Sequence, residues 1–317
     1  MHSKHDLALV FPGQGSQKIG LLADLAREYP LVEHTFAEAS AVLGYDLWQL
    51  AQHGTQEAIN LTERTQPLLL TASVALWRIW QARAGAVPAL LAGHSLGEWS
   101  ALVCAGVVDF ADAVKLVRLR GAFMQDAVPA GVGAMAAIMG LDDALIRTCC
   151  AQAAGDDEVV AAVNFNAPGQ VVIAGHVAAV ERASAACKAA GAKRALPLPV
   201  SAPFHTALMR PAAERLAQHI QDTRFAAPRI PVVHNVHART ETDPAAIKRL
   251  LVEQIHSPVL WTDSVAALVT AGISTTVECG PGKVLSGLNK RIARDLETLA
   301  TEDLASLEQA LAHCQQR

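Results

Sequence analysis

A serine stands between two glycines in the stretch LLAGHSLGEWSALVCAGV, residues 91–108. Apolar runs flank the GHSLG segment, and they predict a strand that turns sharply into a helix. A serine at such a turn projects above the sheet, and the free N–H groups of the helix start favour a developing oxyanion. Ser95 is therefore a candidate nucleophile, with the Leu96 N–H as an oxyanion donor. A glycine-rich turn with a capping serine is the alternative interpretation.

A nucleophilic serine needs a base, and twelve histidines compete for that role. His205 is the best candidate, because it lies in PLPVSAPFHTALM, a loop stiffened by three prolines. An ordinary surface histidine is the alternative, and His234 and His237 are the runners-up. His94 adjoins the serine, but the turn should point it elsewhere. No Asp or Glu stands out as a third member, so a backbone carbonyl is expected to orient the imidazole.

A second glycine-rich loop, FPGQGSQKIG at 11–20, follows the first apolar run. It lacks the GxxxxGK[ST] spacing, and Lys18 stands where GxGxxG needs its last glycine, so phosphate binding is disfavoured. We expect the loop to lie at the edge of the same sheet as Ser95. There Gln14 could donate a backbone or side-chain N–H to the oxyanion. A plain strand-to-helix turn is the alternative.

Composition limits the class of protein. The chain has 317 residues, is 51% hydrophobic and carries a net charge of −4, which argues against nucleic-acid binding. No apolar run approaches the roughly 20 residues of a membrane span, and the apolar run near the N-terminus is too short for a signal peptide. The six cysteines form no CxxC pair and are expected to be reduced and buried. These features predict a cytoplasmic protein without metal-binding spacing.

Hydrophobic patterning predicts an α/β fold, a hydrolase-like parallel-sheet core with an inserted ferredoxin-like small domain. The expected strands are 7–11, 89–93, 133–139, 158–164, 169–174, 193–198, 231–236 and 275–279. The expected helices are 67–84, 96–105, 109–125, 142–154, 176–190, 206–222, 244–256 and 259–271, with another opened by Gly280-Pro281-Gly282. The large catalytic domain is then discontinuous, 1–127 and 200–317, around an insert at 128–199. A ligand site is expected between the two.

Six motifs occur in a familiar order: FPGQGSQ, GHSLGEWSALVCAGV, RLRGAFMQ, NFNAPGQVVIAG, SAPFH and GPGKVLSGL. Together they resemble the malonyl-CoA:acyl carrier protein transacylases of fatty-acid synthesis, over nearly the whole chain. The resemblance extends to the stand-alone bacterial enzymes of the FabD type and, more loosely, to acyltransferase domains of polyketide synthases. It implies a serine acyltransferase that uses malonyl-CoA, acts on the phosphopantetheine thiol of acyl carrier protein, and needs no cofactor.

The resemblance also implies roles for particular residues. Ser95 matches the nucleophile and His205 matches the base and acid. Gln14 and the Leu96 N–H match the oxyanion hole. The remaining matches are Arg120 as the group that binds the malonyl carboxylate, Gln254 as the residue whose main-chain carbonyl orients the histidine, Asn166 as a residue near the pocket, and Phe204 as a malonyl-selective residue that would crowd a 2-methyl branch. Arg120 shares its helix with Lys115 and Arg118, and only the family match raises it above them.

An acidic carrier protein would need a basic patch to dock on this mildly acidic chain. The candidates are Lys193 and Arg194 at the end of the insert, and Lys283, Lys290, Arg291 and Arg294, which are expected on the last large helix. Three rival functions remain: the transacylase subunit of a malonate decarboxylase, a serine hydrolase, and a catalytically inactive docking scaffold. An arginine that binds an acid and a missing triad acid fit a hydrolase poorly. Intact Ser95 and His205 argue against a scaffold.

Overall fold

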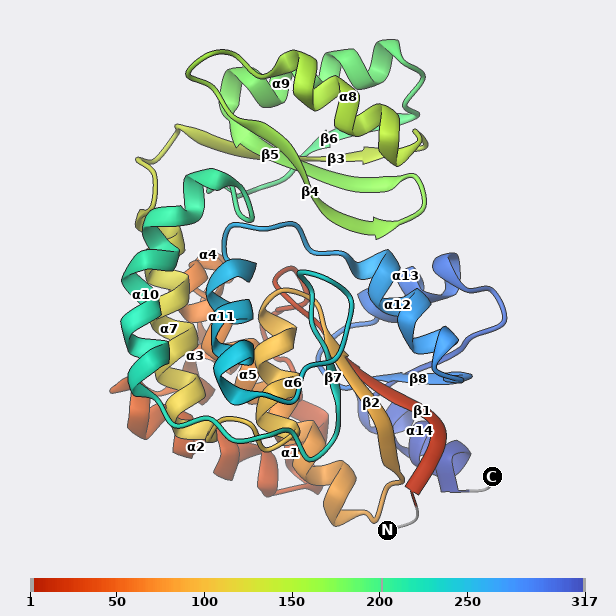
Figure 1. Ribbon diagram of the computed structural model, residues 1–317. Coiled ribbons are helices and arrows are strands. Elements are labelled where there is room, and N and C mark those ends of the chain that lie inside the picture. The colour runs from red at the N-terminus through yellow and green to blue at the C-terminus, as the bar shows by residue number, and fades with distance from the viewer. Residues whose placement is uncertain (1–2, 201, 316–317) are drawn as a thin grey trace.

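The computed structural model describes residues 3–200 and 202–315 and contains two separate sheets (Figure 1). The larger sheet is parallel throughout, in the order β7-β2-β1-β8-β9. Its strands are β1 (Ser3–Phe11), β2 (Val87–Gly93), β7 (Val232–Val233), β8 (Thr275–Glu278) and β9 (Glu297–Ala300). Ser201, the first residue of the SAPFH motif, lies outside the described residues.

The smaller sheet is antiparallel, in the order β4-β5-β3-β6. Its strands are β3 (Gly133–Met139), β4 (Val160–Ala167), β5 (Gln170–His176) and β6 (Arg194–Pro197). The helices α8 (Asp143–Ala153) and α9 (Val177–Ala189) pack on it and share a hydrophobic core with it. In Figure 1 these helices lie above the small sheet, and the larger sheet lies below it.

Both faces of the larger sheet are buried, as expected for parallel strands. Along β1, the side chains of Leu7, Leu9 and Phe11 join one hydrophobic cluster, while those of Ala8 and Val10 join another. The first cluster includes residues of α2, α5, α6 and α7, and the second includes residues of α12 and α13. This two-residue alternation anchors β1, so the loops that follow β1 and β2 emerge together at one edge of the sheet.

The remaining helices surround the larger sheet (Figure 1). In the first part of the chain they are α1 (Ala23–Glu28), α2 (Leu31–Leu43), α3 (Leu47–His53), α4 (Gln56–Asn60), α5 (Thr62–Ala82), α6 (Leu96–Cys104) and α7 (Phe110–Asp126). In the last part they are a 3-10 turn (Ala207–Met209), α10 (Arg210–Asp222), α11 (Pro244–Gln254), α12 (Trp261–Thr270), α13 (Val284–Ile292) and α14 (Leu304–Gln315).

The structure differs from the expected elements in several places. Helix α5 begins at Thr62, five residues before Pro67, so the proline lies inside the helix, where it has no N–H to donate to the carbonyl four residues earlier. Strand β4 continues to Ala167, which leaves a tighter turn before β5. The short β9 and the helix α14 were not expected at all. Lys283 precedes the first residue of α13 and Arg294 lies beyond its end, so neither is on that helix.

Strand β7 is also much shorter than the expected 231–236, and the reason bears on the site. Its regular pairing ends at Val233. The next two residues, His234 and Asn235, turn their polar groups toward the helix that follows the serine, where Glu98 accepts hydrogen bonds from both. These long-range bonds replace the ladder bonds that a longer strand would have made.

Candidate active site

Ser95 lies on a sharp turn between β2 and α6, with φ 51° and ψ −106°. This left-handed φ is strained for a residue with a side chain. A Cβ added at Gly93 would lie 2.0 Å from the carbonyl group of Gly97, and one added at Gly97 would lie 2.0 Å from the Phe11 oxygen. Both glycines are therefore required for close backbone approach.

Asn235 holds both sides of this turn. Its Oδ1 accepts from the Ser95 N–H at 2.8 Å, and its Nδ2 donates to the Gly93 oxygen at 2.7 Å. Asn235 is fully buried, so these bonds face no competition from water. The side chain of a residue 140 positions downstream thus fixes the strained conformation of the serine.

The Ser95 hydroxyl meets His205, with 2.8 Å between Oγ and Nε2. The other ring nitrogen, Nδ1, lies 2.9 Å from the main-chain oxygen of Gln254. That carbonyl can only accept, so the proton belongs on Nδ1 and the Nε2 lone pair faces the serine. Burial, and next the charge of Arg120, lower the pKa of His205 to about 3. The imidazole is therefore neutral near pH 7 and can act as a base.

Arg120 is buried with 1% of its surface exposed, whereas Lys115 and Arg118 on the same helix are exposed. Its Nη2 donates to Ser95 Oγ at 3.1 Å and to Gln254 Oε1 at 2.9 Å, and its Nη1 donates to Gln66 Oε1 at 2.8 Å. Burial lowers the pKa of Arg120 to about 10, so the guanidinium remains charged near neutral pH. A buried cation beside the nucleophile could bind an anionic group of a substrate.

A cavity of about 300 Å³ opens at Ser95. Its polar wall comes from the loop after β1 and from α4, and its apolar wall comes from β3 and the segment before His205. The lining residues are Gln14, Gly15, Gln17, Asn60, His94, Ser95, Arg120, Met124, Met135, Asn164, Leu198, Pro199, Val200, Phe204 and His205. The cavity thus lies between the two sheets and is of a size that suits the end of a small acyl chain.

The structure brings the other predicted residues to this region. Gln14 lines the cavity, and its side-chain Nε2 donates to Thr62 at 3.3 Å. Leu96 is the first residue of α6, so its N–H is one of the donors that a helix leaves without an intrahelical partner. Phe204 lines the apolar wall. Asn166 does not line the cavity, but its Oδ1 lies 2.7 Å from Nε2 of His94.

The runner-up bases lie elsewhere. His234 is fully buried and its Nδ1 is 2.7 Å from Glu98 Oε1, while the ring of His237 packs edge-on against it at 6.1 Å. Neither lines the cavity at Ser95. His94 does line it, but its ring contacts Asn166 rather than the serine. Of the histidines considered, only His205 is hydrogen-bonded to the nucleophile.

Glu98 is a residue that the sequence analysis missed. No acidic residue stood out, yet Glu98 lies three positions after the nucleophile and its side chain is fully buried. It accepts from Gln254 Nε2 at 2.8 Å as well as from His234 and Asn235. One signal was available in the sequence. Between Arg83 and Asp109, His94 and Glu98 are the only residues among Asp, Glu, Lys, Arg and His.

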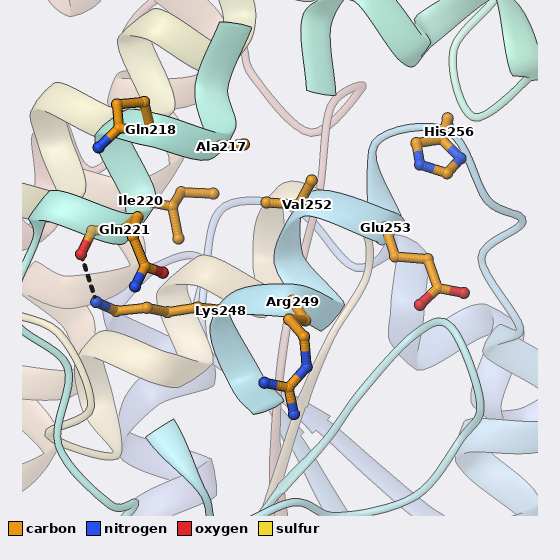
Figure 2. A pocket seen from close by; sticks show the side chains of 9 residues that line it. All are labelled: Ala217, Gln218, Ile220, Gln221, Lys248, Arg249, Val252, Glu253 and His256. Atoms are coloured by element: carbon orange, nitrogen blue, oxygen red, sulfur yellow. Dashed lines mark hydrogen bonds between the residues drawn. The ribbon is translucent and has the colours of Figure 1, made fainter. Parts of the chain in front are cut away.

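A second hollow, of about 450 Å³, lies between α10 and α11 (Figure 2). Its side chains include Lys248, whose Nζ donates to the Gln221 oxygen at 2.8 Å, and His256. It holds none of the residues predicted to react. Within the described residues, no three His, Cys, Asp or Glu side chains are grouped to hold a metal ion. Nor does any helix in 3–200 or 202–315 have the length and apolarity to cross a membrane.

Comparison with known proteins gives a consistent result. The acyl transferase domain family matches residues 8–309. The malonyl CoA-acyl carrier protein transacylase of Salmonella typhimurium is 62% identical over 304 residues, which cover 96% of this chain and 98% of that protein.

Solved structures agree with this match. The acyl carrier protein S-malonyltransferase of Vibrio cholerae is 60% identical, with a TM-score of 0.94 over 96% of this chain and 99% of that one. A malonyl-transacylase solved in complex with a type II polyketide synthase acyl-carrier protein is 56% identical, with a TM-score of 0.96 over 97% and 99% of the two chains. At these identities and over this coverage, the chain belongs to the family of malonyl CoA-acyl carrier protein transacylases.

Proposed function

We propose that this protein transfers a malonyl group from malonyl-CoA to the phosphopantetheine thiol of an acyl carrier protein, through a malonyl ester on Ser95. The observation that carries the proposal is a single hydroxyl with two neighbours. Ser95 Oγ lies 2.8 Å from the buried imidazole of His205 and 3.1 Å from the buried guanidinium of Arg120. Nucleophile, base and a site for a carboxylate therefore share one cavity. The names of the relatives supply the donor and the acceptor.

The first half-reaction acylates the serine. His205 Nε2 takes the hydroxyl proton as Ser95 Oγ attacks the thioester carbon of malonyl-CoA. The tetrahedral intermediate collapses when the carbon–sulfur bond breaks, and the protonated imidazole gives its proton to the CoA thiolate. Gln254 keeps the base oriented, because its main-chain oxygen accepts from Nδ1 at 2.9 Å. Nucleophile, base and oxyanion donors all belong to the chain, so the proposed reaction needs no cofactor or metal.

The oxyanion of the intermediate is stabilised by main-chain donors at the elbow. The Leu96 N–H is at the start of α6, where the helix dipole adds favourable charge. Gln14 belongs to a loop that packs tightly on the elbow, since a Cβ on neighbouring Gly13 would lie 2.5 Å from the His94 oxygen. Because the side-chain amide of Gln14 is directed to Thr62, its backbone N–H is the better second donor. Such donors typically contribute about 3 kcal/mol each.

Arg120 binds the free carboxylate of the malonyl group. A guanidinium makes two parallel N–H···O bonds to a carboxylate and keeps its charge when buried. Phe204 bounds the same cavity on its apolar side and would crowd a branch at the carbon between the two malonyl carbonyls. Asn166 acts indirectly, because its Oδ1 lies 2.7 Å from Nε2 of His94, the residue that precedes the nucleophile in the chain.

The second half-reaction reverses the first with a different thiol. The phosphopantetheine thiol gives its proton to His205 and attacks the malonyl ester, and Ser95 Oγ leaves with the proton returned by the imidazole. Water would compete for the ester, and the wall formed by β3 and the segment before His205 limits its access.

We assign the part of that wall up to Pro199 to a small domain at 128–199, inserted in a large catalytic domain of 1–127 and 200–317. The β-α-β-β-α-β order of the insert and its sheet order β4-β5-β3-β6 support a ferredoxin-like unit. The strand–serine–helix elbow on a parallel sheet supports a hydrolase-like core. Consumption of CoA thioesters suits a cytoplasmic setting. Docking of the acidic carrier would use basic side chains at the end of the insert and around α13, namely Lys193, Arg194, Lys283, Lys290, Arg291 and Arg294.

The direct test is a transfer assay with malonyl-CoA and a phosphopantetheine-bearing acyl carrier protein, in which malonyl carrier, free CoA and free malonate are each measured. The proposal predicts stoichiometric malonyl carrier and CoA, with little malonate, and no transfer by Ser95→Ala. Rapid release of malonate without a thiol acceptor would instead identify a serine hydrolase.

A further inference from the structure

Glu98 is a fully buried carboxylate that the proposed mechanism does not use. Its Oε1 accepts from His234 Nδ1 at 2.7 Å, and its Oε2 accepts from the Asn235 N–H at 3.0 Å and from Gln254 Nε2 at 2.8 Å. All three donors come from outside its own helix. Donors alone face these oxygens, which is the environment of an acceptor-only carboxylate. Removing a charged carboxylate from water costs free energy even when three hydrogen bonds converge on it, so the presence of Glu98 here calls for a functional explanation.

The Gln254 amide has only one favourable orientation in this environment. Around its Nε2 lie three acceptors, namely Ser95 O at 3.0 Å, Glu98 Oε2 at 2.8 Å and Asn235 Oδ1 at 3.3 Å. Its Oε1 accepts from Arg120 Nη2 at 2.9 Å. A reversed amide would place an oxygen against these acceptors and an NH₂ group against the guanidinium. Glu98 contributes the one charged acceptor, and charged acceptors make the stronger bonds.

Arg120 has no carboxylate partner within the part of the chain that the structure describes. Its hydrogen-bond acceptors are the neutral oxygens of Gln66, Gln254 and Ser95, and among the ion pairs of residues 3–200 and 202–315 none includes Arg120. Glu98 nevertheless acts on it, since its charge raises the pKa of Arg120 against the effect of burial. A carboxylate in direct contact would occupy the fork of the guanidinium. With the counter-ion one glutamine away, no carboxylate competes for the guanidinium, and its buried Nε has no hydrogen-bond partner within the described residues.

We propose that Glu98 is a positioning residue that fixes the Gln254 amide and, through it, aims Arg120 at the acyl group, so that it sets the preference for acyl groups that end in a carboxylate. This inference rests on the proposed function, in which Arg120 binds the malonyl carboxylate. We call the chain of contacts from Glu98 through the Gln254 amide to Arg120 the relay. Gln254 serves both functions in it, because its main-chain oxygen holds the base and its side-chain oxygen holds the arginine.

Two substitutions at Glu98 separate the relay from a merely structural role. Glu98→Gln keeps an oxygen that can face Gln254 and Asn235, while its NH₂ can face His234 once the imidazole proton moves to the buried, unpartnered Nε2. Glu98→Leu removes the acceptor. The readout is kcat/KM for malonyl-CoA divided by kcat/KM for acetyl-CoA. We expect Glu98→Leu to lower this ratio about tenfold, a typical effect of losing a charge-assisted bond, and Glu98→Gln to keep it within about threefold.

Glu278→Leu is the matched control. Glu278 is also a fully buried carboxylate on the larger sheet that accepts three bonds, from Leu285 N and from the N–H and Oγ of Ser286. It holds the start of α13 rather than the site. The control should lower the melting temperature and leave the malonyl-to-acetyl ratio unchanged.

If Glu98→Leu does not fold, Gln254→Met decides the question, because it keeps the main-chain oxygen for His205 and removes the side-chain oxygen from Arg120. It should lower the ratio as Glu98→Leu does. Where both single variants fold, the double variant should lose no more than either, since both act through one amide.

An unchanged ratio in folded Glu98→Leu, or an equal loss in Glu98→Gln, overturns the relay. Arg120→Ala separates this failure from that of the proposed function. If Arg120→Ala loses the malonyl preference and Glu98→Leu does not, the relay alone is wrong. If Arg120→Ala also keeps the preference, the assignment of Arg120 is wrong.

Discussion

Ser95 and His205 both have a positive φ, 51° and 63°, and their side chains meet at 2.8 Å. Neither is a glycine, so each conformation carries a cost that the surrounding structure must offset. For Ser95 the surroundings are the two glycine contacts and the Asn235 clamp. For His205 they include the bond from Nδ1 to the Gln254 oxygen. These two strained conformations place Ser95 Oγ and His205 Nε2 within hydrogen-bond distance of each other without a bound substrate.

His205→Ala should reduce serine acylation by malonyl-CoA by about 10²–10⁴-fold, the usual contribution of a general base. The variant loses the bond from Nδ1 to the Gln254 oxygen but no hydrogen bond between two main-chain groups, so the protein should remain folded. Rapid-quench measurement of the acyl-enzyme checks the rate. His219→Ala, on the exposed side of α10, is the matched control and should acylate normally. Normal acylation by His205→Ala would remove this residue from the mechanism.

Gly97→Ala should destabilise the protein strongly, because the new Cβ would lie 2.0 Å from the backbone oxygen of Phe11. The strand cannot move aside without breaking the register of β1 with β2. Gly287→Ala, inside α13 with no atom within 4 Å of the new Cβ, is the control. It should stabilise the protein by about 0.5–1 kcal/mol. Thermal melting of both variants compares them, and equal stabilities would contradict the close packing at the elbow.

Arg120→Lys should lose much of the malonyl preference even though it keeps the positive charge, because an ammonium cannot bridge Gln66, Gln254 and a substrate carboxylate with one planar fork. We expect kcat/KM for malonyl-CoA to fall by about tenfold or more, in line with the loss of a charge-assisted bond. Activity with acetyl-CoA should fall less. Arg118→Lys, at an exposed position on the same helix, is the control. An equal loss with both substrates would show that Arg120 acts only on the serine.

The acylation rate should stay nearly constant as the pH falls from 8 through the ordinary histidine range. The base must be neutral to act, and burial lowers the pKa of His205 to about 3, so protonation does not remove the base near pH 6.5. The charge of Arg120 also lowers this pKa, so the acid limb in Arg120→Ala should move to higher pH. Pre-steady-state acylation with acetyl-CoA measures both profiles. A limb near pH 6.5 in the unmodified protein would contradict a buried, neutral base.

The local sequence pattern was enough to predict the turn that carries Ser95, because neighbouring residues determine that turn. The GHSLG turn, its strand and its helix follow from neighbouring residues, and the structure has them within a few positions. The clash that requires each glycine was also foreseeable, because a turn this tight brings the strand and helix into contact.

Long-range contacts account for what sequence patterns could not provide. Arg120 is buried while Arg118 is exposed, and only the packing of α7 distinguishes them. Glu98 meets His234 across 136 positions and Asn235 across 137. The same contacts shorten β7, so an apolar pattern that predicted a longer strand was wrong there. The four residues of β9 are too few to show a clear alternation.

The central claim is that Ser95 carries the malonyl group. Intact-protein mass spectrometry after brief exposure to malonyl-CoA tests it most directly, with Ser95→Ala beside the unmodified chain. The account predicts the addition of one malonyl group to the unmodified protein, mapped by peptide analysis to Ser95, and no addition to the variant. An unmodified protein that never gains this mass, or a variant that still gains it, would contradict the account.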